Sequence, residues 1–212
     1  MEKTEALERL LKKEVKEAAR EFYRNCMDYF KLNANEDIHQ QFIEEFREIF
    51  RALMHGERKQ EVCFLQVSLM RAKALSGEPF YRLEAYGPDF YLGEPLATRE
   101  LQLNWMYREY GRFCEAVDKG SKRYIRCFQE PEISRIKLAE LYTAQRIVRY
   151  LYQDALIELV HTEEFKALKV REGFQLQMGE YRGPYERLYE VNDCTKRLGE
   201  IWYGLLSNNG AN

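Results

Sequence analysis

Two histidines each follow a glutamate at the same spacing. Glu36-Asp-Ile-His39 and Glu158-Leu-Val-His161 are both Glu-x-x-His motifs. Residues three apart share one helix face, so a carboxylate and an imidazole at this spacing can reach one metal ion. In helical bundles, two such motifs and two further glutamates hold a pair of iron or manganese ions. However, His39 begins its expected helix and His161 ends another, where a metal would be poorly enclosed. We therefore predict no metal and no other cofactor, and a di-metal oxidoreductase is the third functional hypothesis.

Basic residues recur on one side of the helix expected from Pro131 to Val160. Placed at about 100° per residue, they share a narrow sector that no carboxylate enters. Such a sector can bind the carboxylates of a protein surface or, with its aromatic residue, the phosphates and bases of a nucleic acid. It can also pair with the glutamates of the chain's own helices. The predicted partner- or anion-binding residues, which include three from the preceding segment, are Arg135, Tyr142, Arg146, Arg149, Lys122, Arg123 and Arg126.

Catalytic motifs are otherwise missing from the sequence. It contains no glycine-rich phosphate loop, no His-Glu-x-x-His and no Gly-x-Ser-x-Gly. Pro88-Asp89 and Glu164-Phe-Lys166 are fragments of a nuclease pattern, but a whole helical region separates them. No spacing links Cys194 to His161 as a nucleophilic pair, and a buried, inert cysteine is the simpler interpretation. The sequence therefore favours a protein that is not an enzyme.

The amino-acid composition limits the classes of protein to which this chain could belong. The chain has 212 residues, 32% of them charged, with a formal charge of −2, which argues against a generally basic nucleic-acid coat. Its charged start predicts no signal peptide, and its longest uncharged stretches are too short to span a membrane. Five scattered cysteines fit neither a disulfide framework nor a zinc ribbon. We therefore expect a cytoplasmic protein with reduced thiols, of bacterial origin.

Hydrophobic periodicity predicts four long amphipathic helices. The first covers residues 2–32, and the second follows a cap at Asn33–Glu36 and carries Ile38 to Leu53. The third begins at a Thr98 cap and ends near residues 119–122. The fourth begins near Pro131, with Leu138, Leu141, Ala144, Val148, Leu151, Ala155 and Leu159 inward.

Alternating residues and turn signals predict two small antiparallel β-hairpins. The first pairs residues 63–69 with 80–86, and residues 90–92 form a third short strand. The second contains residues 174–178 and turns at Gly183-Pro184. Tyrosines and phenylalanines concentrate around both hairpins, which suits either a binding surface or the margin of a core.

The predicted fold class is α+β and predominantly helical. We expect one compact domain over residues 1–206, with a closing helix at 193–206 and a disordered tail at 207–212. A faint echo between Glu84–Pro88 and Gly179–Pro184 suggests two helix-plus-hairpin halves, 1–95 and 96–206.

The leading functional hypothesis is a non-enzymatic regulatory or accessory module that binds an acidic protein through the arginine-rich helix face. The alternative is a nucleic-acid or nucleotide-binding protein that uses the same basic face. No membrane association is expected, and the sequence leaves the partner's identity, the pathway and the oligomeric state open.

Overall fold

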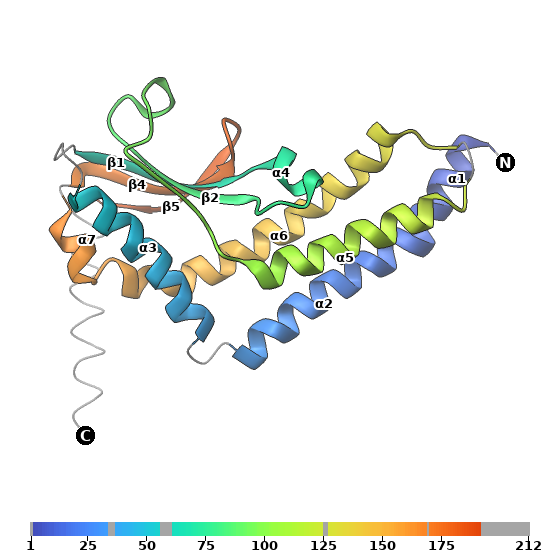
Figure 1. The fold of residues 1–212 in the computed structure, drawn as a ribbon, viewed down its shortest axis with the longest axis horizontal. Coiled ribbons are helices and arrows are strands. Elements are labelled where there is room, and N and C mark those ends of the chain that lie inside the picture. Colours follow the sequence, from blue (N-terminus) through green and yellow to red (C-terminus); the bar gives the residue numbers. More distant parts are fainter. Residues whose placement is uncertain (1, 34–36, 56–60, 125–126, 169, 192–212) are drawn as a thin grey trace. The chain divides into compact units, whose positions relative to one another are not determined.

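The computed structural model describes residues 2–33, 37–55, 61–124, 127–168 and 170–191, and its fold is α+β, as predicted. Long helices and one five-stranded mixed sheet make up the chain (Figure 1). The predicted cap at 33–36, the closing helix at 193–206 and the tail at 207–212 fall wholly or largely outside the described residues. The helices are α1 (Lys3–Leu10), α2 (Lys16–Asn33), α3 (Asp37–His55), α4 (Arg71–Ser76), α5 (Asn104–Ser121), α6 (Glu130–Leu159) and α7 (Glu163–Ala167), and the strands are β1 (Val62–Leu69), β2 (Tyr81–Tyr86), β3 (Ala97–Glu100), β4 (Val170–Glu180) and β5 (Tyr185–Glu190).

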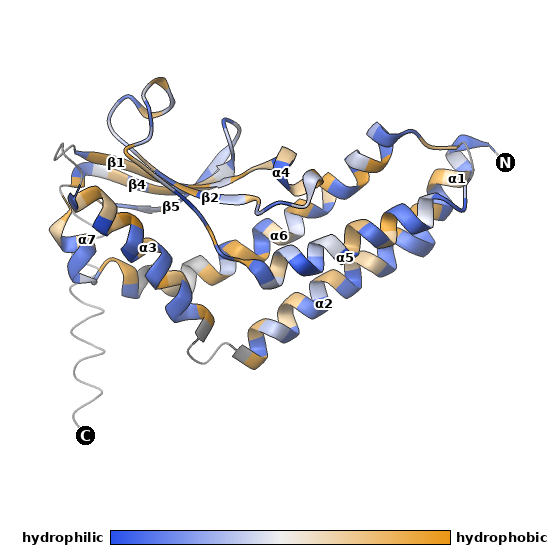
Figure 2. Ribbon diagram, viewed as in Figure 1, coloured by the Kyte–Doolittle hydropathy of each residue, from blue (hydrophilic) through white to orange (hydrophobic). Residues whose placement is uncertain are grey.

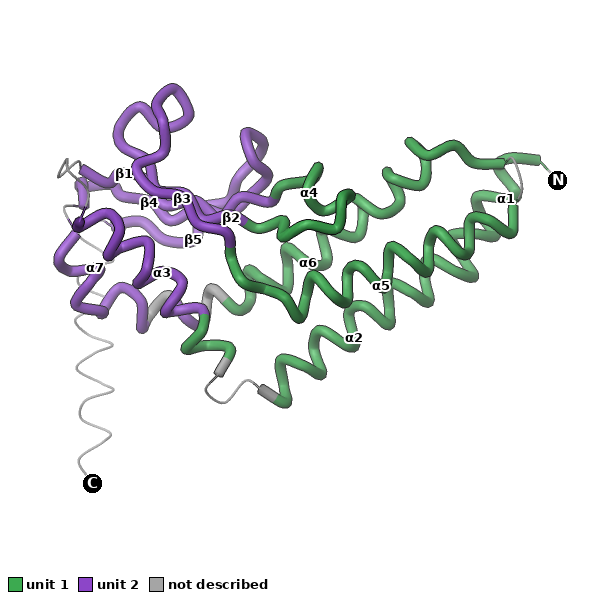
Figure 3. Tube along the Cα trace, viewed as in Figure 1, with its two compact units in different colours: residues 1–41, 70–81, 101–151 green, residues 42–69, 82–100, 152–212 purple. Residues whose placement is uncertain are grey.

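The chain divides into two compact units that are interleaved along the sequence (Figure 3). Unit 1 holds residues 1–41, 70–81 and 101–151, and unit 2 holds 42–69, 82–100 and 152–212. Each unit draws on both of the predicted halves, and the division at residue 95 stays a prediction about how the chain arose.

Unit 1 is built from amphipathic helices, whose apolar and polar residues alternate around α2, α5 and α6 (Figure 2). The first predicted helix is a continuous run in which a π-helical segment, Leu11–Val15, joins α1 to α2. The core of unit 1 centres on Tyr110 of α5, whose ring lies 6.0 Å from that of Phe22 and 5.2 Å from that of Phe80. All three side chains are buried, and edge-on aromatic pairs of this kind add to the energy of area burial.

A glycine lets two helical segments of unit 1 approach closely. A Cβ at Gly120 of α5 would lie 2.9 Å from Cβ of Glu14 and 3.4 Å from Cδ1 of Leu10. Leu10 is itself fully buried at this contact. The end of α5 therefore packs against the first helical run through backbone that no larger residue could present without a shift.

Unit 2 is a sheet with the strand order β3-β2-β1-β4-β5. The two predicted hairpins join in this one sheet because β1 pairs with β4 in parallel, over registers such as Leu65 with Leu176. Every residue of β1 except Phe64 is buried, which is typical of a strand covered on both faces. The segments α3 and α7 cover one face, where the Phe50–Phe165 and Phe165–Phe174 rings both lie 5.7 Å apart (Figure 1).

Three local predictions are wrong. Residues Phe90–Leu92 form a 3₁₀ turn instead of a strand, because Phe90 has a φ of 47°, outside the β region. Thr98 does not cap a helix: it pairs with Glu84 inside β3, and α5 begins at Asn104. Leu138 is only partly buried, since the inward side of α6 runs through Ile133, Lys137 and Leu141.

None of the helices in the described ranges has an apolar stretch long enough to cross a bilayer.

Candidate functional site

The Tyr–Arg face of α6, which we define as Arg135, Tyr142, Arg146, Arg149 and Tyr150, lies in unit 1. Tyr142 is 68% exposed and Tyr150 is 53% exposed. Arg135 and Arg146 are exposed, whereas Arg149 is half-buried and has a contact within the protein. Tyr142, Arg146 and Tyr150 follow one another at four-residue steps, so they form a continuous row of side chains.

Around Tyr142 and Arg146, this face carries positive charge without a compensating carboxylate on the same side of α6, whereas Glu132, one turn before Arg135, interacts electrostatically with that arginine. Glu140 is the single acidic residue between positions 135 and 150. It lies about 160° around the helix from Tyr142 at the ordinary α-helical turn per residue. The exposed guanidinium group of Arg146 is therefore open to an acidic group from outside the chain, whereas Arg135 interacts with Glu132 and Arg149 has a contact within the protein.

Tyr150 is the member of this face that the sequence reasoning missed. Its ring lies 5.9 Å from that of Phe30 in an edge-on contact, so α2 supports it from one side. Its spacing of four residues from Arg146 was the signal that could have identified it.

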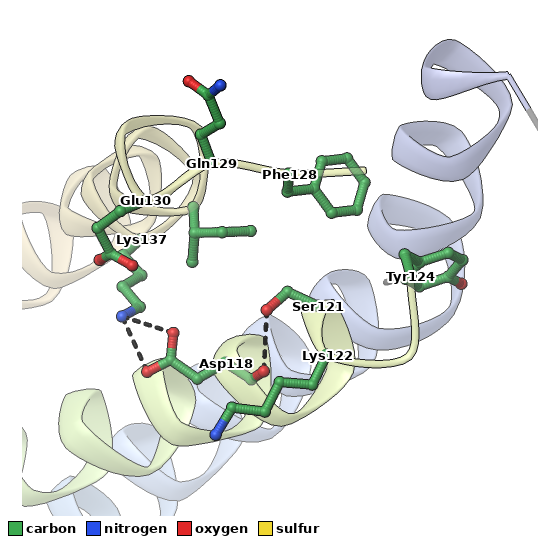
Figure 4. Close-up of a pocket in the computed structure, with 9 residues that line it drawn as sticks. Asp118, Ser121, Lys122, Tyr124, Phe128, Gln129, Glu130 and Lys137 are labelled. Carbon is green, nitrogen blue, oxygen red and sulfur yellow. Dashed lines mark hydrogen bonds and ion pairs between the residues drawn. The ribbon is translucent and has the colours of Figure 1, made fainter. Parts of the chain in front are cut away.

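A cleft of about 430 Å³ lies where α5 ends and α6 begins, within unit 1 (Figure 4). Lys122, one of the predicted anion-binding residues, lines it and is exposed. The Tyr124 and Phe128 rings line it too and lie 5.9 Å apart. At its base, Nζ of Lys137 lies 2.7 Å from Oδ1 and 2.9 Å from Oδ2 of Asp118, so this lysine is already neutralised.

The other two residues of the predicted basic segment do not join that cleft. Arg123 is exposed but forms an ion pair with Glu14, so its charge serves the fold of unit 1. Arg126 lies outside the described residues.

The two Glu-x-x-His motifs do not form a described site. Glu36 is outside the described residues, and His39 and His161 belong to different units. Glu158 is exposed, and burial together with Lys166 lowers the pKa of His161. Among the residues that the structure describes, no cluster of three or more histidine, cysteine, aspartate or glutamate side chains could hold a metal ion.

Glu109, a buried carboxylate of α5, is saturated by hydrogen bonds. Asn25 donates to Oε2 at 3.0 Å, and the guanidinium groups of Arg108 and Arg112 donate to Oε1 at 3.1 and 2.8 Å. Burial raises the pKa of Glu109, but these donors outweigh burial and the net pKa is lowered. Burial, with a smaller contribution from the Glu109 carboxylate, raises the pKa of the Cys26 thiol to about 12, so that cysteine is inert.

A second cluster, on the sheet of unit 2, was not predicted. Alternate residues of the three middle strands place Gln66, Ser68, Arg82, Glu84 and Gln177 on the sheet face opposite α3 and α7; we name this set the polar floor. Four of these side chains are at most 1% exposed, and Arg82 is half-buried.

Glu84 is the centre of the polar floor. Its Oε2 accepts a hydrogen bond of 2.6 Å from Ser68, and its Oε1 accepts bonds of 2.8 Å from Arg82 and 3.0 Å from Tyr86. Burial and the Glu84 carboxylate raise the pKa of the Tyr86 hydroxyl well above its ordinary value. Burial also raises the pKa of Tyr91. A hydrogen bond from the Arg182 peptide N–H to the Tyr91 hydroxyl opposes part of that rise. These hydroxyls therefore act as hydrogen-bonding groups near neutral pH and not as bases.

No family model, no curated protein and no solved structure matches this chain.

The two sites differ in what they could bind. The Tyr–Arg face is an exposed surface that suits a macromolecule. The polar floor is enclosed, so it suits a small molecule or a structural role.

Proposed function

We propose that this chain is a protein-interaction module that binds an acidic partner through the Tyr–Arg face of α6. One observation carries the proposal: Tyr142, 68% exposed, lies one helical turn from the exposed Arg146, and no acidic residue within a turn of either shares that side of α6. An exposed tyrosine beside an exposed arginine is the combination of residue types that is enriched at protein interfaces.

The residue types of this face are those that dominate protein interfaces. Tyrosine and arginine are enriched among the residues that contribute most to binding. Tyrosine offers a large contact area with few rotatable bonds, so it loses little conformational entropy when it is buried. Tyr142 and Tyr150 would supply apolar contact on either side of Arg146.

The charge of the face indicates the chemistry of the partner. The whole chain has a formal charge of −2, so the positive charge is local to this surface. A guanidinium group matches the geometry of a carboxylate through two parallel hydrogen bonds. A surface with aspartate or glutamate side chains, or an acidic helix, would complement Arg135 and Arg146.

The cleft at the α5–α6 junction is separate from the Tyr–Arg face. Ile133 and Lys137, which line it from the first turns of α6, lie about 160° around the helix from Arg135. The proposed interface is therefore the Tyr–Arg face alone.

The module is proposed to act as a regulatory or accessory subunit in the reducing cytoplasm. Cys26 and Cys63 are buried free thiols, and Cys114 and Cys127 are partly exposed free thiols. Unpaired cysteines of this kind suit a compartment where thiols stay reduced.

Affinity purification from cells of the source organism tests the proposal. The wild-type chain should retain one acidic protein that the double variant Arg135→Glu with Arg146→Glu releases, because attraction becomes like-charge repulsion. The control is Lys16→Glu with Lys31→Glu, the same charge change at two exposed positions of α2. It should retain the partner as the wild type does.

Two results would contradict the proposal. One is an unchanged set of partners in the Arg135→Glu and Arg146→Glu variant. The other is a bound component that nuclease destroys and whose affinity falls steeply as salt rises, which identifies a nucleic acid as the ligand.

A further inference from the structure

The polar floor contains buried polar atoms that the protein leaves without a partner. Both amide atoms of Gln66, Oε1 of Gln177 and Nε of Arg82 make no hydrogen bond of ordinary geometry, although the Gln66 amide lies close enough to the Tyr91 hydroxyl to oppose the rise of its pKa. These are four of the six such side-chain atoms in the described part of the chain. Buried groups of this kind cost roughly 1–3 kcal/mol each, so a concentration of them calls for an explanation.

The orphaned atoms lie together on neighbouring strands. Gln66 of β1 is in direct register with Gln177 of β4, and Arg82 is on β2, the strand on the other side of β1. Both glutamines are completely buried.

One of the two polar atoms of the Gln177 amide has a hydrogen bond within the protein. Its Nε2 donates a hydrogen bond of 2.7 Å to Oε1 of Gln175, which fixes the amide and leaves Oε1 as a free acceptor. The polar floor thus presents one donor and two acceptors from two adjacent amides. Glu84, in contrast, has hydrogen bonds to both of its oxygens and needs no ligand.

Aromatic rings cover the polar floor. The Phe90 ring lies 4.7 Å from that of Phe64 and 5.3 Å from that of Tyr86, both of which share the face of the polar floor. The Tyr91 ring lies 5.3 Å from that of Tyr86 and 6.1 Å from that of Tyr181. Figure 1 shows the segment between β2 and β3 rising from the sheet on the side away from α3 and α7.

The covering segment is held in a strained conformation between two glycines. Phe90 has a φ of 47°, a left-handed conformation that is unfavourable for a bulky side chain. Gly87 and Gly93 flank it. Residues 87–96 would have to move to admit a molecule to the polar floor.

We propose that the polar floor and its aromatic cover form a binding site for a planar nitrogen heterocycle of the nucleobase type. Glutamine and asparagine amides recognise such rings through a donor and an acceptor on one edge, as they do adenine. Aromatic rings such as Phe90 and Tyr91 stack on the faces of heterocycles. The free donor and acceptors of Gln66 and Gln177 would be satisfied by one ring edge.

This proposal is independent of the Tyr–Arg face, since it concerns unit 2 alone. The test is ligand-observed NMR of the full chain with adenine, guanine, cytosine, uracil and their nucleosides. We expect at least one of these compounds to bind the wild type and to raise its melting temperature. Gln66→Leu should remain folded without ligand, because it deletes the two unpaired atoms, and should weaken binding at least tenfold.

The control is Gln145→Leu, which makes the same chemical change on α6 of unit 1. It should bind the heterocycle as the wild type does. The proposal is overturned if no compound of the panel binds, or if Gln66→Leu binds as well as the wild type. It is also overturned if a crystal structure grown with the panel shows only ordered water on Gln66 and Gln177.

Discussion

The Ser68 hydroxyl donates a hydrogen bond of 2.6 Å to Oε2 of Glu84, and neither side chain is more than 1% exposed. Hydrogen bonds to charged groups contribute more than neutral ones, and a buried oxygen left without its donor pays a desolvation cost. Ser68→Ala should therefore lower the free energy of unfolding by about 2 kcal/mol.

Urea denaturation measures that loss. The control is Ser76→Ala, which removes a hydrogen bond of 2.7 Å to Glu78 at an exposed position and should cost less than about 0.5 kcal/mol. Equal losses in the two variants would show that the Ser68–Glu84 bond contributes nothing beyond a surface contact.

Two glycine substitutions should act in opposite directions. A Cβ at Gly179 of β4 would lie 2.2 Å from the Pro184 carbonyl oxygen and 2.5 Å from Cα of Tyr185. These are backbone atoms of the β4–β5 turn, so Gly179→Ala should destabilise the protein by about 3 kcal/mol or more.

Gly111 lies inside α5 with no atom within 4 Å of its Cβ position. Gly111→Ala should stabilise by about 0.5–1 kcal/mol, since alanine favours the helix.

Thermal unfolding of the two variants provides the check. The melting temperature should fall for Gly179→Ala and rise for Gly111→Ala. A Gly179→Ala protein as stable as the wild type would mean that the turn is not packed as described.

Glu109 should make the free energy of unfolding depend on pH in the acidic range. Its folded pKa is lowered, so it binds a proton less readily in the folded than in the unfolded state. The stabilisation is therefore present above the unfolded pKa of about 4.3 and is lost as pH falls through the lower folded pKa. Glu109→Gln should cost about 1–2 kcal/mol near pH 7 and clearly less near pH 3.

Urea denaturation of this variant across that pH range tests the sign. Glu21→Gln, at an exposed position of α2, should follow the wild-type profile. A Glu109→Gln cost that does not shrink in acid would contradict the assignment of Asn25, Arg108 and Arg112 as its stabilising donors.

The long helices could be predicted because their apolar residues recur at helical spacing over many turns. The strands near residues 63–69 and 80–86 could be predicted from alternation. The parallel pairing of β1 with β4 could not, because it joins residues more than a hundred positions apart without a local signal. β3, with the sequence Ala-Thr-Arg-Glu, has no apolar alternation at all.

The two candidate sites also differ in how far the sequence could predict them. The Tyr–Arg face is a property of one helix, so its members follow from spacing alone. The polar floor depends on strand register, and polar residues at alternate strand positions ordinarily indicate a solvated face. Gln66 and Ser68, inside an otherwise apolar strand, were its only sequence signal.

The most direct measurement of the central claim is photo-crosslinking from position 142 in cells of the source organism. A benzophenone amino acid replaces Tyr142 in the test variant. In the matched control it replaces Tyr23 of α2, whose side chain is 50% exposed. The Tyr–Arg face predicts a nuclease-resistant adduct with one acidic protein from position 142 and none from position 23. No adduct at position 142, the same adducts at both positions, or an adduct with nucleic acid would contradict the account.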